Sequence, residues 1–363
     1  MHIMYLVKRW EHHTRSGGYD ALANTPGARV VTRPNPTGIP RIVARQVWKR
    51  TVDKSHLLDY RYEDWLAELK VMAAVGLTGW ADVVHVLYGD EQLNVLLKYR
   101  SLLRRPLVAT FHLPTSRTLD RFEADQERLL RGVDIAVAVS TNQLPGLERW
   151  FGRGRVVYVP HGIDTVCFTP DESIHRSRTV RLVSVGNCMR DWESLHRVMD
   201  ECSALKLDVE LDLVTQPEYF AFLTGCNKVK FHSGISEAEL VSIYRKSDAL
   251  LLPLLDATAN NAILEAMACG TPVITTDVSG VQNYVGQDAG WLLPKGDVTS
   301  MVSLIKTICA DREVAASKRY AARQQALKFD WTEIRLQLAA VYQTAITQKR
   351  NVGTSITRSA LCD

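Results

Sequence analysis

The chain has 363 residues, of which 46% are hydrophobic, enough for two domains that each bury a core. Residues 1–160 carry 23 Lys and Arg against 16 Asp and Glu, a net charge of +7, whereas the remainder carries 21 against 24, or −3. A mildly basic half fits an anionic substrate or an anionic membrane surface. No basic-aromatic motif of a nucleic-acid module is present, so we expect no nucleic-acid partner.

All seven cysteines follow residue 166, with no Cys-x-x-Cys pair and no His/Cys ligand spacing. This predicts reduced thiols in a cytoplasmic protein and no metal site. The apolar segment 1–7 is too short for a signal peptide, and no run approaches the ~20 apolar residues of a membrane span. We therefore expect a cytoplasmic protein that is soluble or peripheral on the inner face of the membrane.

The first predicted strand covers residues 1–7, and the loop after it carries Gly17 and Gly18 ahead of a helix. Paired glycines let the backbone approach a ligand closely. Further on, residues 41–50 have helical spacing, with Arg41, Arg45 and Lys49 on one face and apolar residues on another. Such a helix fits either a membrane surface or an ordinary helix laid on a sheet, and we favour the ordinary helix.

Two strands of the first half end in polar loops. Residues 81–87 run into 88–91, and residues 106–112 end at His112. Because ligands bind at the carboxyl ends of parallel strands, we expect His112 to point toward a ligand, whereas His85 is expected to be structural.

The second half opens with a predicted strand, 180–186, whose following loop holds one cation, Arg190. The guanidinium fork of arginine binds phosphate with two hydrogen bonds. Later, Ser236 is a predicted N-cap for the helix 238–246.

The stretch 249–276 has the most specific pattern. A buried strand, 249–254, leads through a polar loop to a helix that begins near Asn261, with Asn260 as the predicted N-cap. Gly270 ends the helix, and a second buried strand covers 273–276. The start of this helix would attract a phosphate, and Glu265, about one turn on, could reach a neighbouring sugar hydroxyl.

Residues 265–273 read Glu-Ala-Met-Ala-Cys-Gly-Thr-Pro-Val. This stretch resembles the retaining, nucleotide-sugar-dependent glycosyltransferases of family 4 (glycosyl transferases group 1), which have the GT-B fold. The segment 160–164, Pro-His-Gly-Ile-Asp, resembles the Pro-Asn-Gly-Val-Asp segment of the family, with His161 in place of Asn. The resemblance covers most of the second half closely and the first half only at scattered loops.

The resemblance implies roles for particular residues. Glu265 would bind the nucleotide ribose, Ile235 would lie beside the base, and His112 would lie beside the donor sugar. The implied catalytic residues are His112, Arg190 and Asn261. The implied donor-binding residues are Gly17, Gly18, Gly186, Ile235, Asp256, Thr258, Asn260, Asn261 and Glu265.

Two positions depart from the family pattern. The acidic residue that usually stands eight positions before the ribose Glu is Ala257 here, with Asp256 one residue earlier. Either Asp256 substitutes for it, or Asn260 and Asn261 hold the sugar. The Arg that usually follows the glycine of the phosphate loop is also missing, since Gly186 is followed by Asn187.

The expected fold class is therefore α/β of the GT-B type, with two Rossmann-like domains that face a central cleft. We expect an acceptor-binding domain over 1–168 and a donor-binding domain over 169–328. A helix over 329–349 should cross back to the first domain, followed by a disordered tail over 350–363.

The expected reaction is transfer of a sugar from a nucleoside diphosphate of UDP or GDP type, used as substrate without a bound cofactor. The acceptor would be a glycan, lipid-linked or small-molecule hydroxyl, the configuration would be retained, and the product would be a glycan, glycolipid or glycosylated metabolite. Two alternatives stay open: a noncatalytic binding or scaffold protein on a decayed GT-B fold, and a sugar-nucleotide epimerase of the same fold.

Overall fold

The structure, a computed structural model, describes residues 1–8, 18–34, 38–52, 60–118, 129–174 and 177–359. These residues form two compact units. The first comprises Met1–His13, Tyr19–Pro160 and Ile334–Asp363, and the second comprises Thr14–Gly18 and His161–Glu333. The domain boundaries expected at residues 168 and 328 stay predictions.

The first unit is built on a parallel sheet of six strands in the order β2-β1-β3-β4-β5-β6. Its strands are β1 (Ile3–Val7), β2 (Ala28–Thr32), β3 (Val83–Val86), β4 (Leu107–Phe111), β5 (Ile135–Ala138) and β6 (Val156–Tyr158). Its described helices are η1 (Tyr19–Asn24), α1 (Gly38–Thr51), α2 (Tyr62–Thr78), α3 (Val95–Lys98), α4 (Thr115–Thr118), η3 (Thr141–Gln143), α6 (Leu144–Phe151) and most of α14 (Trp331–Ser359).

Alternate residues of the central strands face opposite sides of this sheet. Met4 and Leu6 of β1 pack in one core cluster with Val71 of α2 and Leu147 of α6. On the other face, Tyr5 and His85 meet Tyr342 of α14. The strands read as continuous apolar runs because helices cover both faces.

The second unit has a parallel sheet of six strands in the order β12-β11-β10-β7-β8-β9. Its strands are β7 (Val180–Val185), β8 (Val209–Val214), β9 (Val229–His232), β10 (Ala249–Leu252), β11 (Val273–Thr276) and β12 (Gly290–Leu293). Its helices are α7 (Trp192–Ala204), η4 (Pro217–Leu223), α8 (Glu237–Lys246), α9 (Asn261–Ala268), α10 (Val281–Tyr284), α11 (Val298–Ala310), α12 (Glu313–Ala316) and α13 (Arg319–Leu327).

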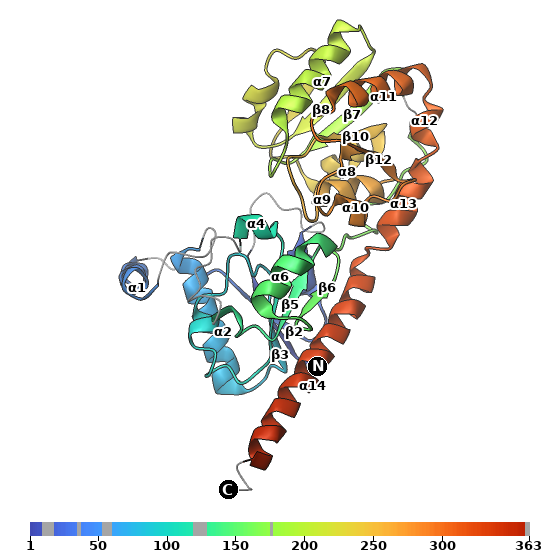
Figure 1. Cartoon of the computed structure of the whole chain (residues 1–363). Helices are drawn as coiled ribbons and strands as arrows, with labels where there is room; N and C mark the ends of the chain where they lie inside the picture. Colours follow the sequence, from blue (N-terminus) through green and yellow to red (C-terminus); the bar gives the residue numbers. More distant parts are fainter. Residues whose placement is uncertain (9–17, 35–37, 53–59, 119–128, 175–176, 360–363) are drawn as a thin grey trace. The chain divides into compact units, whose positions relative to one another are not determined.

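Helices cover both faces of this second sheet. Helices α7 and α11 lie side by side over one face, and α8, α9 and α13 pack on the other (Figure 1). Counted along the chain, the strand order of this unit is that of dinucleotide-binding Rossmann folds. Each unit is thus a doubly wound α/β domain, with helices on both faces of a parallel sheet, which confirms the expected fold class.

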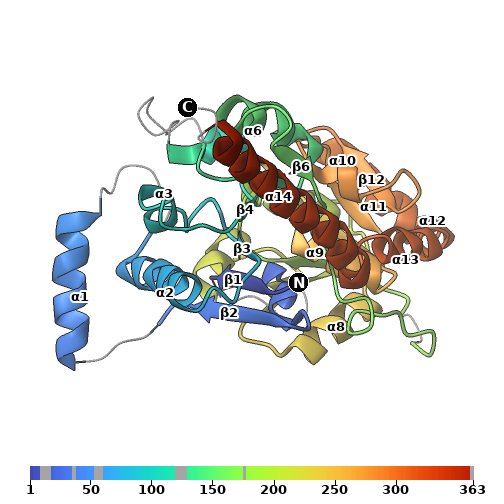
Figure 2. The ribbon, with the colours of Figure 1, turned by 90° about the horizontal axis from the view of Figure 1, so that it is seen from below.

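Helix α14 joins the two units through the chain itself and is drawn as one long helix (Figures 1 and 2). Its residues from Ile334 onward belong to the first unit, as expected for the crossover helix. Four of its buried residues recur at helical spacing: Ile334, Leu338, Val341 and Ala345. The helix continues to Ser359, past the expected end at 349, and residues 360–363 lie outside the described part.

Helix α1 corrects one expectation. We predicted an ordinary helix laid on a sheet, but the apolar side chains Ile42, Val43 and Val47 are 60%, 53% and 41% exposed. Figure 2 draws α1 beside α2, away from the sheet. The apolar face therefore stays uncovered, and the helix keeps both its apolar and its basic residues at the surface.

Candidate functional site

The topology of the second unit brings three loops to one sheet edge. The chain reverses its winding between β7 and β10, so the loops after these neighbouring strands leave the same edge in opposite directions. The loop after β9 leaves that edge as well, because all six strands are parallel. Crevices of this kind are where open α/β sheets bind ligands.

The loop after β7 is shaped by Arg190. Its guanidinium donates Nε and Nη2 to the carbonyl of Val185, at 3.0 and 2.5 Å, and Nη1 to the carbonyl of Cys188 at 2.8 Å. The side chain is buried, which lowers the pKa of Arg190 to about 10 while leaving it charged at neutral pH. Gly186 has φ +82°, and a Cβ there would lie 2.8 Å from Nη2 of Arg190. Only glycine fits this turn.

Arg190 thus stabilises the loop in addition to carrying a positive charge. These three hydrogen bonds use three of the five N–H groups of the guanidinium, so two can still turn to an anion. The loop is also tied to the strand-to-helix loop after β10. The amide of Leu255 donates to the carbonyl of Met189 at 2.9 Å, and that of Asp191 donates to Pro253 at 3.0 Å.

Helix α9 begins at Asn261, as predicted, and Asn260 occupies its N-cap position with an extended backbone. The expected capping bond is absent, however, because the Asn260 side chain accepts no hydrogen bond from the described helix. Its Oδ1 is buried without a partner among the described residues. The first amides of α9 therefore keep their donors for another acceptor, and the positive end of the helix dipole lies there.

Glu265 lies on the buried side of α9, with only 4% of its surface exposed. Its Oε2 accepts a hydrogen bond of 2.8 Å from the hydroxyl of Tyr244 on α8. Burial and the neighbouring carboxylate raise the pKa of Tyr244 well above its ordinary value, so the phenol stays a donor. The sequence pattern predicted a role for Glu265 but gave no sign of Tyr244, which stands 21 residues away.

The remaining predicted donor-binding residues of the second unit lie in the loops after β10 and β9. Asp256 is half-buried, and its Oδ1 accepts the amide of Ala257 at 2.8 Å. Thr258 is buried, and Ile235, after β9, packs against the same core cluster as α9. Gly186, Arg190, Asp256, Thr258, Asn260 and Asn261 therefore belong to joined loops of one edge. Their roles, like that of Ile235, stay predictions.

In the first unit, His112 stands directly after β4, as predicted. Its Nε2–H donates to the carbonyl of Leu87 at 2.7 Å, and its ring contacts those of Tyr19 and Tyr88, with centroids 4.6 and 4.9 Å away. Burial lowers the pKa of His112 to about 4. The imidazole is therefore neutral near pH 7.

Asp90 positions the backbone of His112, and sequence reasoning did not single it out. Its Oδ2 accepts the amides of His112 at 2.5 Å and of Leu113 at 3.3 Å. Only 5% of the residue is exposed, and this burial raises the pKa of the Asp90 carboxyl to about 7. The signal that could have found it is its place in the short loop that follows the apolar strand β3.

The sequence also singled out His85 of the first unit and the glycine pair Gly17–Gly18. His85 is fully buried and bonded at both ring nitrogens, to Tyr342 at 2.7 Å and Thr110 at 2.8 Å, as expected of a structural histidine. Gly18 is described and buried just before η1. Gly17 lies outside the described residues.

Both halves of the chain match known protein families. A family described as "Glycosyl transferases group 1" matches residues 179–311, and "Glycosyltransferase Family 4" matches residues 21–166. The chain belongs to the family-4 glycosyltransferases. The match over 179–311 lies within the second unit, and the match over 21–166 lies in the first unit apart from residues 161–166, so both halves carry the family signature.

Curated relatives of this glycosyltransferase align over most of its length. The MMP alpha-(1->4)-mannosyltransferase of Mycolicibacterium hassiacum is 24% identical over 90% of this chain and 86% of its own. The phosphatidyl-myo-inositol mannosyltransferase of Mycolicibacterium smegmatis is 25% identical over 78% of this chain and 74% of its own.

Solved structures share the fold. Sucrose-phosphate synthase of Thermosynechococcus elongatus superposes with a TM-score of 0.71 at 18% identity, covering 96% of this chain and 99% of its own. HepE of Anabaena, crystallised with UDP and glucose, gives a TM-score of 0.69 at 19% identity, covering 95% and 100%. The fold of this family-4 enzyme is therefore GT-B.

Among the described helices of this glycosyltransferase, none combines the length and the apolar character that crossing a bilayer requires.

Proposed function

We propose that this glycosyltransferase moves a sugar from a nucleoside diphosphate of UDP or GDP type to an acceptor hydroxyl, with retention of the anomeric configuration. The acceptor is a glycan, a lipid-linked molecule or a small molecule. The product would enter a glycan, glycolipid or glycosylated metabolite.

The observation that carries the proposal is the uncapped start of α9 at the switch point of the second sheet. The Asn260 side chain does not cap the helix, and Arg190 is joined to the same edge through Met189 and Leu255. Free helix amides and an arginine together suit a diphosphate, which carries negative charge on several oxygens. The names of the relatives, and the UDP in HepE, support this choice of donor.

Glu265 would accept hydrogen bonds from the ribose hydroxyls of the donor. Its Oε2 accepts a hydrogen bond from the hydroxyl of Tyr244, which orients the carboxylate on α9. A buried carboxyl oxygen of this kind favours a ligand with a hydroxyl group, because the oxygen would otherwise lose a hydrogen bond. Asp256 or the Asn260–Asn261 pair would contact the transferred sugar.

The chemistry requires no covalent protein nucleophile. As the bond from the anomeric carbon to the diphosphate breaks, negative charge grows on the leaving oxygen, and Arg190 and the Asn261 amide stabilise it electrostatically. The leaving diphosphate then accepts the proton of the attacking hydroxyl on the same face, which gives retention. His112, neutral at pH 7, would hold a donor-sugar or acceptor hydroxyl by hydrogen bonding.

The test is turnover of a panel of UDP- and GDP-sugars by the purified full chain, with thermal stabilisation as a binding assay. A true donor at ~100 Kd should add ~2.7 kcal/mol to the free energy of unfolding. Product anomers are then assigned by NMR, and an α-linked product from an α-linked donor supports retention. Donor binding without any turnover would favour the scaffold alternative, and conversion of the donor without acceptor would favour the epimerase.

A further inference from the structure

Three side chains with metal-binding atoms meet on the second unit, away from the loops described above. His196 and Asp200 lie one turn apart on α7, and Cys226 lies in the turn between η4 and β9. Their ligand atoms lie within 4.8 Å of one another. This turn precedes β9 and so lies toward the amino edge of the sheet, opposite the edge of Arg190 and Asn261.

His196 is oriented as a metal-binding histidine usually is. Its Nδ1–H donates to the carbonyl of Phe222 at 2.8 Å, so the lone pair of the neutral ring is on Nε2. Metal-bound histidines commonly donate their other nitrogen to a backbone carbonyl. Nε2 lies 2.9 Å from Oδ2 of Asp200, so two electron-pair donors face one another unless a proton or a cation lies between them.

Cys226 completes the group with a softer ligand. Its Sγ lies 3.5 Å from Oδ1 of Asp200 and 3.7 Å from Nδ1 of His196. Bonds of ~2.3 Å to sulfur and ~2.0–2.2 Å to nitrogen or oxygen put neighbouring ligands of a tetrahedral zinc ion roughly 3.3–3.6 Å apart. The 3.5 Å between Sγ and Oδ1 of Asp200 falls in this range, and the 2.9 Å between Nε2 of His196 and Oδ2 needs to widen by a few tenths of an ångström.

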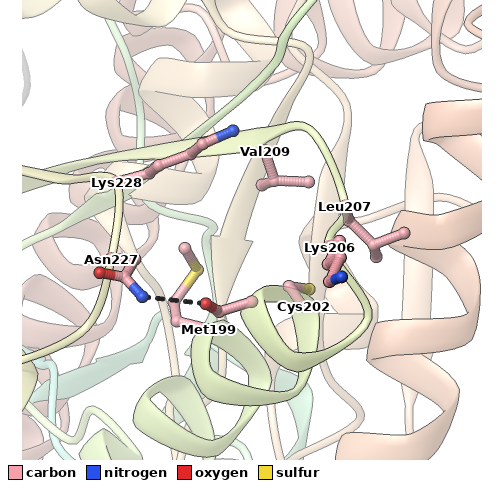
Figure 3. Close-up of a pocket in the computed structure, with 8 residues that line it drawn as sticks. Met199, Cys202, Lys206, Leu207, Val209, Asn227 and Lys228 are labelled. Carbon is pink, nitrogen blue, oxygen red and sulfur yellow. Dashed lines mark hydrogen bonds between the residues drawn. The ribbon is translucent and has the colours of Figure 1, made fainter.

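The turn that carries Cys226 is held against α7. Asn227 donates its Nδ2–H to Oγ of Ser203 at 3.1 Å, the bond drawn as a dashed line in Figure 3. The two residues line a hollow of about 450 Å³ between the end of α7 and the starts of β8 and β9. The bond keeps Cys226 close to the helix face that bears Asp200, so the group is pre-organised by the fold.

We propose that His196, Asp200 and Cys226 bind one divalent cation of borderline softness, Zn²⁺ by preference, with water at the fourth position. Imidazole, carboxylate and thiolate together are a donor set that zinc accepts. The half-exposed side chains leave room for the water. The site is independent of the sugar-transfer reaction.

Binding has a defined proton balance. The thiol of Cys226 donates to Oδ1 of Asp200 at 3.5 Å, so its proton must leave before the sulfur can bind a metal ion. The S–H bond breaks as the metal–sulfur bond forms, and one proton leaves to solvent. The affinity for metal should therefore rise with pH.

The test uses the full chain, stripped of metal with a chelator, and Co²⁺ as a spectroscopic probe. We expect one equivalent of Co²⁺ to give a thiolate-to-metal charge-transfer band and the visible bands of a tetrahedral ion, with Zn²⁺ displacing it. Cys226→Ser should abolish the charge-transfer band, and His196→Ala and Asp200→Asn should weaken binding at least about tenfold. The matched control is Cys188→Ser, which removes an exposed thiol outside the group and should leave the charge-transfer band and the affinity for Co²⁺ unchanged.

A second measurement keeps the test decisive if a variant folds poorly. In the wild-type chain, Zn²⁺ should slow alkylation of Cys226, measured by peptide mass spectrometry, and should leave Cys188 reactive. Equal alkylation of Cys226 with and without Zn²⁺ would overturn the proposal, as would a charge-transfer band that survives in Cys226→Ser.

Discussion

At the scale of single residues, Glu265 and Arg190 each have a structural role as well as a proposed role in binding the donor. Glu265 holds the Tyr244 hydroxyl, and Arg190 holds two carbonyls of its own loop. A substitution at either residue therefore alters a local structure as well as a proposed ligand contact, and each variant needs a control that separates the two effects.

Glu265→Ala should weaken binding of the free nucleoside diphosphate as well as of the full donor. A lost hydrogen bond between the carboxylate and a ribose hydroxyl costs ~1.5–3 kcal/mol, roughly 10- to 150-fold in Kd. Calorimetric titration with UDP and GDP measures it. Tyr244→Phe is the matched control, since it frees Oε2 but keeps the carboxylate, and should leave affinity within about threefold. Unchanged nucleotide affinity in folded Glu265→Ala would contradict the ribose role.

Arg190→Lys should lower turnover more than donor affinity. Lysine keeps the positive charge but cannot bond Val185 and Cys188 together and still offer a fork to the diphosphate. Steady-state kinetics should give a kcat that falls at least about tenfold with a smaller rise in KM. If Arg190→Ala kept the wild-type kcat, another cation would have to stabilise the leaving group.

Asp90 should make stability depend on pH. Its folded-state pKa is about 7, above the ordinary value of 3.8, so between these values the folded protein keeps a proton that the unfolded chain has lost. The contribution of the neutral carboxyl is complete below about pH 4 and is lost as pH rises toward 7, by at most ~1.4 kcal/mol per unit.

Asp90→Asn removes this titration and keeps an oxygen for the amides of His112 and Leu113. The melting temperature of the variant, relative to wild type, should therefore rise between pH 4.5 and 8. The matched control is Asp288→Asn, at an exposed position, where the difference should stay flat. A flat difference for Asp90→Asn as well would show that the carboxyl does not titrate in this range.

At the scale of elements, α1 exposes Ile42, Val43 and Val47 alongside Arg41, Arg45 and Lys49. A helix with apolar and basic residues both at the surface suits an anionic leaflet, which an acceptor carried on a lipid would require. We expect salt-sensitive sedimentation with vesicles that contain anionic lipid, and little with neutral vesicles.

Changing Arg41, Arg45 and Lys49 to Gln should reduce this binding by ~3 kcal/mol, roughly 150-fold in partitioning. The control variant changes Lys295, Lys306 and Lys328, which are exposed on the second unit, by the same net charge. Equal losses in both variants would indicate general electrostatics, and wild-type protein that stays in the supernatant at low salt would favour a soluble acceptor.

Sequence patterns located the elements of the second unit closely because its local signals agree. The strand 273–276 and the start of α9 at Asn261 follow from an apolar run, a polar loop and Gly270. The sequence could not show whether the Asn260 side chain caps the first turn of α9. Asn260 is a residue that often caps, and only tertiary packing decides that its Oδ1 stays without a partner.

At the scale of the whole molecule, the family resemblance gave the fold, whereas contacts between distant residues needed coordinates. Tyr244 with Glu265, Asp90 with His112, and Cys226 with His196 are each pairs that no periodic pattern links. The exposure of α1 is likewise a tertiary property, since an amphipathic pattern does not say whether the apolar face is covered.

The bonds of Tyr342 have a consequence for how the last helix is aligned. Its buried hydroxyl lies 2.7 Å from Nδ1 of His85 and 3.3 Å from the hydroxyl of Tyr5. If α14 slid by one turn, Leu338 or Ile346 would replace Tyr342 there, and the buried Nδ1 of His85 would lose its hydrogen bond. The hydrogen bonds of Tyr342 therefore favour a single register of α14 on the sheet. A helix held by apolar contacts alone would tolerate such a slip. The slip would change the number of residues that connect the first sheet to the second.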